Sequence, residues 1–191
     1  MTKQLNLYEI RDKAMKSGRE IYSIQQLANL IGKPKRITKV YFSRLVKKKL
    51  AKRLLRGRIS FTDDDYIIAT QMVEPSYISL NSALLFHGLI QQIPTQVECI
   101  TTKNSFRFPK LGITYHKIPP SLFFGYEKHK KGNSYILVAE PEKALIDAIY
   151  LNALNKPNAL EILEKIDLKK VTDFLKRFKG KGKKKLERYL L

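Results

Sequence analysis

Apolar residues at helical spacing mark two segments near the start of the chain. The first stripe runs from Leu5 to Ala14. The second covers 24–31, with Ser23 directly before it, Gln26 at capping-box spacing from Ser23, and Gly32 directly after it. A period of three to four is typical of amphipathic helices, and glycine is common just past their last turn. Two helices are therefore predicted.

A third helix is predicted over 35–49, after a turn that Pro34 imposes. Its expected apolar contacts are Ile37, Val40, Phe42, Leu45 and Val46. Most other positions are basic or hydroxylated, which predicts an exposed polar face. That face consists of Arg36, Thr38, Lys39, Tyr41, Ser43, Arg44, Lys47 and Lys48.

Two short extended runs follow the third helix, at 52–55 and 58–61, and Arg56-Gly57 joins them. Because glycine permits the positive φ that a tight hairpin needs, a two-stranded ribbon is predicted. The basic residues of this ribbon are Lys52, Arg53, Arg56 and Arg58. Helix, capped helix, basic helix and hairpin in this order are typical of a winged helix-turn-helix, which we predict over 1–62.

The rest of the chain predicts a second, mixed unit, after a connection over 63–75. A buried helix is expected over 79–87, and further helices are expected over 140–151, from 157 and over 168–178. Alternating or β-rich runs predict strands at 97–102, 105–108, 113–118, 122–126 and 135–138. The predicted fold class is α+β: the winged helix-turn-helix, then a small mixed α+β domain over 76–178 with a largely antiparallel sheet, then a basic C-terminal tail over 179–191.

The charge of the chain is concentrated at its two ends. It has 37 Lys and Arg against 17 Asp and Glu, a formal net charge of +20. Residues 1–61 carry 17 basic and three acidic side chains, 62–170 carry 12 of each, and 171–191 carry eight and two. A basic segment that also has a helix-turn-helix pattern indicates a polyanionic partner.

Double-stranded DNA is the partner that this segment predicts. Arginine can bind guanine through two hydrogen bonds, and Lys, Ser, Thr and Tyr can hold phosphates. An isolated lysine-rich helix is usually only a solvated face. Here the capped helix and the basic hairpin favour DNA, with RNA as the alternative nucleic acid. For the basic C-terminal tail, contact with phosphates or with an acidic protein and solvated disorder are equal alternatives.

Residue types that perform catalysis or bind metals are few and scattered. The single cysteine, Cys99, excludes an intramolecular disulfide, and no Cys-x-x-Cys pair is present to hold zinc. The histidines lie far apart in the sequence. Four carboxylates could gather two metals for nuclease chemistry, although acidic residues at a helix N-terminus are the simpler explanation for the second and third of them: Glu98, Glu140, Glu142 and Asp147. We predict no enzyme, no cofactor and no metal.

The N-terminal residues lack the apolar core of a signal peptide, and no run approaches the length of a membrane span. A cytoplasmic protein without a membrane partner is therefore expected.

Several motifs occur in a familiar order after the predicted winged helix. They are PSYISLNSALLFHGLIQQIP, VECITT, ITYHKIPPSLFFGY and ILVAEPEKALIDAIYL. In this order the chain resembles AbiEi-type antitoxins, which are predicted transcriptional regulators of viral-defence loci. The resemblance covers about 21–151 and is most specific at Ser79, Ala83-Leu84, Gly88-Leu89, Pro94 and 139–147. Two features depart from it: Lys49 stands where such winged helices often carry glycine, and the basic C-terminal tail has no counterpart.

The resemblance implies an antitoxin of a type IV toxin–antitoxin system that represses its own promoter. The second domain would oppose a nucleotidyltransferase-like toxin, with which the family does not generally form a stable complex. Inverted repeats in the promoter are the expected target, and binding as a dimer or as separate monomers both fit them. The alternative from the residues alone is a winged-helix regulator without a toxin, in which the α+β domain senses a ligand or only mediates dimerisation.

Overall fold

The structure is a computed structural model that describes residues 6–190. Residues 1–5 and 191, which belong to the predicted segments 1–62 and 179–191, lie outside the described residues, and so does the predicted helical position Leu5. The chain divides into two compact units. One comprises the residues up to Met72 together with Lys130–Ile136, and the other comprises Val73–His129 and Leu137–Leu191.

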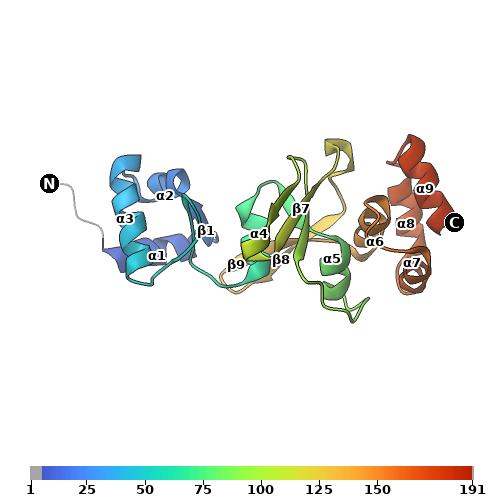
Figure 1. Ribbon diagram of the computed structural model, residues 1–191, viewed down its shortest axis with the longest axis horizontal. Helices are drawn as coiled ribbons and strands as arrows, with labels where there is room; N and C mark the ends of the chain where they lie inside the picture. Colours follow the sequence, from blue (N-terminus) through green and yellow to red (C-terminus); the bar gives the residue numbers. More distant parts are fainter. Residues whose placement is uncertain (1–5, 191) are drawn as a thin grey trace. The chain divides into compact units, whose positions relative to one another are not determined.

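The first unit combines four helices with a small antiparallel sheet among its described residues (Figure 1). Its sheet has the order β1-β3-β2, so the predicted two-stranded hairpin gains a third strand that was not predicted. The elements are α1 (Leu7–Lys16), β1 (Ile21–Ser23), α2 (Ile24–Ile31), α3 (Lys35–Lys47), β2 (Lys52–Leu55), β3 (Arg58–Ser60) and α4 (Asp65–Met72).

Local capping signals that the sequence predicts are present. The Ser23 hydroxyl accepts a hydrogen bond from Gln26 N, and the Gln26 side chain accepts one from Ser23 N, which completes the capping box of α2. Gly32 ends that helix at a φ of 63°, and Gly57 turns the β2–β3 hairpin at a φ of 77°. These bonds satisfy backbone groups that a helix end would otherwise leave without partners.

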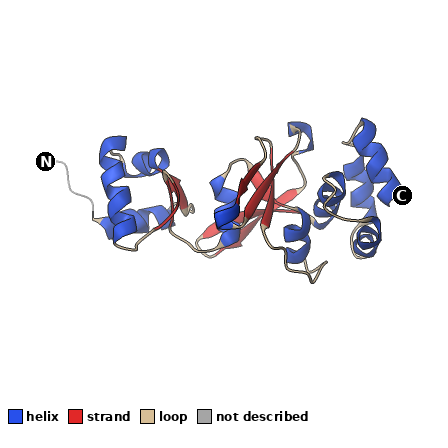
Figure 2. Cartoon of the chain, in the orientation of Figure 1, coloured by secondary structure: helices blue, strands red, loops and turns tan. Residues whose placement is uncertain are grey.

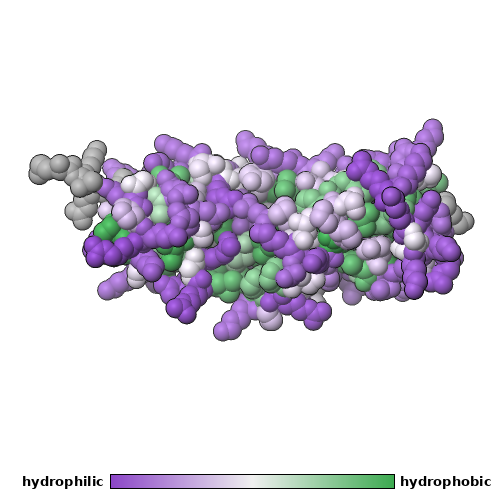
Figure 3. Space-filling view, turned by 90° about the horizontal axis from the view of Figure 1, so that it is seen from above, coloured by the Kyte–Doolittle hydropathy of each residue, from purple (hydrophilic) through white to green (hydrophobic). Residues whose placement is uncertain are grey.

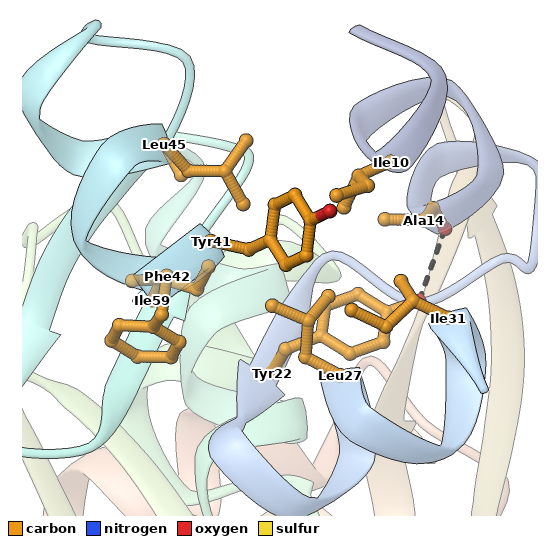
Figure 4. Close-up of a cluster of buried hydrophobic side chains, with 10 residues drawn as sticks. Ile10, Ala14, Tyr22, Leu27, Ile31, Tyr41, Phe42, Leu45 and Ile59 are labelled. Carbon is orange, nitrogen blue, oxygen red and sulfur yellow. Dashed lines mark hydrogen bonds between the residues drawn. The ribbon is translucent and has the colours of Figure 1, made fainter. Parts of the chain in front are cut away.

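The core of the first unit is built where α1, α2 and α3 meet (Figure 4). Tyr41 points from α3 toward Ile10 of α1, and the fully buried Leu45 lies one turn further along α3. The Tyr22 hydroxyl donates to Ala14 O at 3.1 Å, which connects β1 to α1. Apolar burial of this kind is the main favourable contribution to the stability of a small domain.

Helix α4 lies within the stretch 63–75 that we predicted as a connection, and together with Lys130–Ile136 it completes the first unit. Gln71 accepts hydrogen bonds at its Oε1 from the backbone N–H groups of Glu20 and Ile21. The Ser134 hydroxyl accepts from Gln71 Nε2 at 2.7 Å and donates to Gly18 O at 2.8 Å. Buried polar atoms need hydrogen-bond partners, and these bonds hold α4 and Ser134 against the segment 18–21, although the three lie far apart in the sequence.

The second unit is a mixed α+β structure (Figure 2). Its sheet has the order β6-β7-β5-β4-β9-β8. The remaining elements are β4 (Ser76–Ile78), α5 (Leu80–Phe86), β5 (Val97–Thr101), β6 (Phe106–Phe108), η1 (Pro109–Leu111), β7 (Ile113–Lys117), η2 (Pro120–Leu122), β8 (Tyr126–Lys131), β9 (Ser134–Ala139), α6 (Pro141–Tyr150), α7 (Lys156–Leu163), α8 (Leu168–Leu175) and α9 (Gly180–Leu190).

The sheet departs from the prediction in three respects, the first of which is the strand β4, which was not predicted. Antiparallel pairs are present as expected, but β5 pairs with β7 and β4 pairs with β9 in parallel. The strand predicted over 122–126 is wrong. Leu122 ends the 3₁₀ turn that Pro120 begins, and Gly125 adopts a φ of 70°, so the chain cannot stay extended there. The strand begins instead at Tyr126.

Residues 180–190 of the predicted basic tail form the helix α9, which packs against α6, α7 and α8. Phe178, Leu186 and Leu190 are buried there. Basic and apolar residues alternate at helical spacing in α9, so its apolar side can be buried while the lysines lie at or near the surface. Hydrophilic side chains accordingly dominate the visible surface of the C-terminal helices, at the right of Figure 3.

Candidate nucleic-acid interface

Helix α3 carries most of the predicted DNA-binding residues. Pro34 occupies its N-cap position without a side-chain hydrogen bond, and its carbonyl accepts from Thr38 N at 3.0 Å. The helix ends at Lys47, and Lys49 follows with a φ of 55°. That left-handed conformation favours glycine over residues with a side chain.

Six of the eight residues predicted on the exposed face of α3 are exposed. They are Arg36, Lys39, Ser43, Arg44, Lys47 and Lys48. Within residues 6–190, none of the five basic members of this set forms an ion pair. Their charges are therefore not neutralised by a neighbouring carboxylate, and the face is strongly basic.

The prediction is wrong for Thr38 and Tyr41, which are buried. Thr38 is 0% exposed, and its hydroxyl donates to the carbonyls of Lys33 and Pro34. Tyr41 is 8% exposed within the core. Thr38, Tyr41, Phe42 and Leu45 have the i, i+3, i+4, i+7 spacing of one helix face. Tyrosine and threonine can be buried on that face because each has an apolar part, and the Thr38 hydroxyl finds partners in the preceding turn.

Ile37 and Val40 lie on the opposite side of α3, although the sequence predicted them in the core. Their exposed fractions are 39% and 47%. They share the first two turns of the helix with Arg36 and Lys39. They were predicted in the core because they are apolar. Their outward position depends on how α3 is rotated about its axis where it packs on the other helices.

The β2–β3 hairpin presents the other predicted basic residues. Arg53 and Arg56 are exposed, and Arg58 is half-buried. Lys52 is exposed but pairs with Asp63 at 2.9 Å, and hydrogen bonding to that carboxylate raises the pKa of the lysine. Because exposed ion pairs contribute little free energy, this one does not exclude a phosphate contact by Lys52.

The carboxylates considered for metal chemistry each have a partner in the second unit. Glu140 and Glu142 share Lys170, and hydrogen bonding to Glu140 raises the pKa of that lysine. Asp147 forms an ion pair with Lys143. Glu98 accepts from Asn81 N at 3.2 Å, and burial raises the pKa of its carboxyl. Among residues 6–190 no group of three or more His, Cys, Asp and Glu side chains is arranged to hold a metal ion.

A buried polar cluster surrounds the Lys143–Asp147 pair. Tyr77 and Ser79 donate to Asp147 Oδ2 at 3.0 and 2.8 Å. Lys143 Nζ donates to the Tyr77 hydroxyl at 3.0 Å. Burial lowers the pKa of Lys143, and it raises the pKa of Tyr77. Since all four side chains are at most 1% exposed, the cluster positions α6 against the sheet rather than presenting a site to solvent.

A cavity of about 360 Å³ lies elsewhere in the second unit. Its lining is largely polar, with the carboxylate of Glu98 and several carboxamides. The polar lining residues are Asn81, Gln92, Thr95, Gln96, Glu98, Asn155 and Asn158. Its volume lies within the range of small-molecule sites in proteins.

The basic residues of the last two helices are partly paired with neighbours. Lys176 pairs with Asp173 at 2.6 Å, and Lys183 pairs with Glu187 at 3.6 Å. Lys185 donates to Asn152 Oδ1 and Tyr150 O. The exposed Lys179, Lys181, Lys184 and Arg188 form no ion pair within the described residues, so this surface also offers basic side chains to a polyanion.

Two further observations concern the whole described chain. None of the helices within residues 6–190 has the length and apolar character needed to cross a membrane. Comparison with protein-family models and with curated proteins finds no match to this chain.

Proposed function

We propose that the first unit is a winged helix-turn-helix and that the protein is a DNA-binding transcriptional autorepressor. The observation that carries this proposal is the basic face of α3, where five exposed Lys and Arg residues have no ion-pair partner among residues 6–190. Helix α2, the turn at Gly32 and α3 occur in the order of a helix-turn-helix, and β2–β3 occupies the place of the wing. In such proteins the second helix enters the major groove.

Electrostatics supports DNA as the ligand. Residues 1–61 carry a net charge of +14, and hydrophilic side chains cover most of the visible first unit, at the left of Figure 3. Arg36 and Lys39 lie in the first turns of α3, the part of a recognition helix that contacts base edges. Arg53 and Arg56 on the hairpin would contact the adjacent phosphate backbone.

Fluorescence anisotropy of the full-length chain with duplex DNA from upstream of its own gene tests the proposal. If about six phosphates are neutralised, affinity falls roughly a thousandfold from 50 to 200 mM salt. Arg36→Ala and Arg44→Ala should each weaken binding about tenfold. Lys165→Ala removes an exposed charge outside the first unit and should leave the affinity unchanged.

Unchanged affinity in an Arg36→Ala/Arg44→Ala double variant would exclude α3 as the DNA-contacting element. An RNA duplex of the same sequence serves as competitor. Preferential displacement of the DNA by this RNA would replace the DNA proposal with the RNA alternative.

We further propose that the protein acts as the antitoxin of an AbiEi/AbiEii-like type IV system, a proposal that rests on the motifs of its second unit. Most of the motif residues form α5, β5, β7, β9 and α6, which make up much of the sheet and its packed helices. A nucleotidyltransferase-like protein encoded beside the gene should arrest growth when it is expressed alone, and co-expression of the full-length chain should restore growth. The Arg36→Ala/Arg44→Ala variant should still restore it, because antitoxicity is assigned to the second unit. Continued growth arrest with the wild-type chain would contradict the antitoxin role.

The cavity beside Glu98 favours a second candidate, a ligand-sensing regulator without a toxin. It combines one carboxylate with several carboxamides, which suits a small polar molecule. Thermal-shift screening of polar metabolites, with Asn158→Leu as the variant that fills the cavity, tests this role. A stabilising compound that also changes DNA affinity would support it, and the absence of any such compound would count against it.

A further inference from the structure

Two branched apolar side chains lie exposed within the basic face of α3. Ile37 and Val40 are 39% and 47% exposed, while their neighbours Thr38 and Tyr41 are buried. Residues three apart lie on the same side of a helix, about 4.5 Å apart along its axis. They therefore form one small apolar surface rather than two separate positions.

The packing of α3 leaves this surface without a role in the core. The buried face is already complete with Thr38, Tyr41, Phe42 and Leu45. Single exposed apolar residues are common on protein surfaces and need no explanation by themselves. This pair is distinguished by its surroundings, because exposed Arg36, Lys39, Arg44 and Lys47 lie on the same helix.

The basic residues around Ile37 and Val40 indicate which kind of partner can bind this surface. A second copy of the same surface would bring like charges together, which disfavours self-association. A polyanion with an apolar group at its centre is complementary. Duplex DNA has this arrangement in its major groove, where the C5-methyl group of thymine projects between two rows of phosphates.

We propose that Ile37 and Val40 contact thymine methyl groups and thereby contribute to the sequence preference of the protein. This inference rests on the proposed function. Side chains three positions apart on a helix lie about 5–6 Å apart at their Cβ atoms, so the pair is wide enough to contact two neighbouring base pairs, which are stacked about 3.4 Å apart. Isoleucine and valine are stiff at χ1, so their methyl groups present a preformed surface to the groove.

Replacing thymine by uracil removes the C5-methyl group and leaves the hydrogen-bonding groups of the base in place. The upstream DNA is amplified once with dTTP and once with dUTP, and both duplexes are titrated with the full-length chain. We expect about tenfold weaker binding to the uracil duplex, in line with the loss of two buried methyl groups.

Two variants separate methyl contact from a general effect of uracil on the duplex. Ile37→Ala/Val40→Ala should bring the affinities for the two duplexes much closer together, because alanine removes most of the apolar surface. Arg36→Ala should weaken binding to both while keeping the ratio between them. Exposed positions tolerate alanine, so unfolding curves of the variants should match the wild type within about 0.5 kcal/mol.

Each result decides between the two proposals. Equal, specific binding of the wild type to both duplexes would overturn the methyl contact and leave DNA binding in place. An undiminished thymine preference in Ile37→Ala/Val40→Ala would overturn the assignment to these residues. Absence of binding to either duplex would overturn the proposed function and this inference with it.

Discussion

Lys143 forms a buried ion pair with Asp147, one turn later on α6. Asp147 also accepts from Tyr77 and Ser79, so the carboxylate connects α6 with β4 and the residue that follows it. A charge removed from water in this way is stable only while its partners remain. The motif AEPEKALIDAIYL thus encodes a structural polar cluster in addition to a helix.

Lys143→Met should lower the free energy of unfolding by about 3–5 kcal/mol, because it leaves the Asp147 charge buried without its counter-ion. Lys143→Met/Asp147→Leu should cost less than the sum of the single substitutions. The double variant leaves no buried charge without a counter-ion, and it loses the hydrogen bonds of Tyr77 and Ser79 to Asp147 and that of Lys143 to Tyr77, about 1–3 kcal/mol for each buried polar group left without a partner. Urea denaturation of the four proteins measures the coupling, and strictly additive costs would contradict a direct ion pair.

The phase of α3 predicts opposite effects for two neighbouring substitutions. Tyr41→Ala should reduce the free energy of unfolding by about 3 kcal/mol, because it opens a cavity in the core. Arg44→Ala should leave stability within about 0.5 kcal/mol and weaken DNA binding. Denaturation and anisotropy on the same samples separate the two effects. A stable Tyr41→Ala beside a destabilised Arg44→Ala would show that the helix is rotated.

This phase also shows what the sequence could predict. The start and end of α2 were predictable, since Ser23, Gln26 and Gly32 act within a few residues of each other. The outward position of Ile37 was not, because it depends on how α3 packs against α1 and α2. Residue type alone placed isoleucine inside and tyrosine outside.

The same distinction holds for the sheets. The β2–β3 hairpin was predictable from the glycine at its turn, which is a local signal. Strand β1 has three residues and joins β3 across 35 or more positions, with Tyr22 opposite Ile59. The parallel pairing of β5 with β7 likewise depends on the path of the chain between them. The cavity beside Glu98 could not be predicted because its lining comes from two distant stretches, 81–98 and 153–158.

Lys49→Gly should stabilise the protein by about 1 kcal/mol. Lys49 adopts a φ of 55°, a conformation that costs an L-residue roughly 1–2 kcal/mol and costs glycine little. Lys48→Gly is the matched control. Its φ is −84°, so glycine there brings only greater freedom in the unfolded chain and should destabilise. Thermal unfolding of both variants tests the prediction, and equal effects would contradict strain at Lys49.

Cys99 should resist thiol reagents in the folded protein. The side chain is 0% exposed in β5, and burial raises the pKa of its thiol, so the reactive thiolate is disfavoured. As Cys99 is the single cysteine, Ellman's reagent reports on one site. We expect its reaction to follow the urea unfolding curve of the second unit. Rapid reaction in buffer without denaturant would show that β5 is accessible.

His116 should make the second unit less stable as the pH falls below neutral. Its Nε2 atom is buried and has no hydrogen-bond partner within the described residues. Burial, and secondarily the charge of Arg107, lower the pKa of the imidazole from the ordinary 6.5. Between the folded pKa and 6.5 the unfolded chain binds more protons, so stability is complete above 6.5 and is lost as the pH falls through this window.

His116→Gln isolates this effect, because Glu20 and Glu98 have raised pKa values and contribute with the opposite sign. Burial favours their protonated form in the folded state, so their contribution is present at low pH and is lost as the pH rises. The difference in unfolding free energy between wild type and His116→Gln removes these shared contributions. As the pH falls from about 7.5 to about 5, the unfolding free energy of the wild type should decrease relative to that of His116→Gln. If the unfolding free energies of the two proteins change in parallel with pH, the pKa of His116 is not lowered in the folded protein.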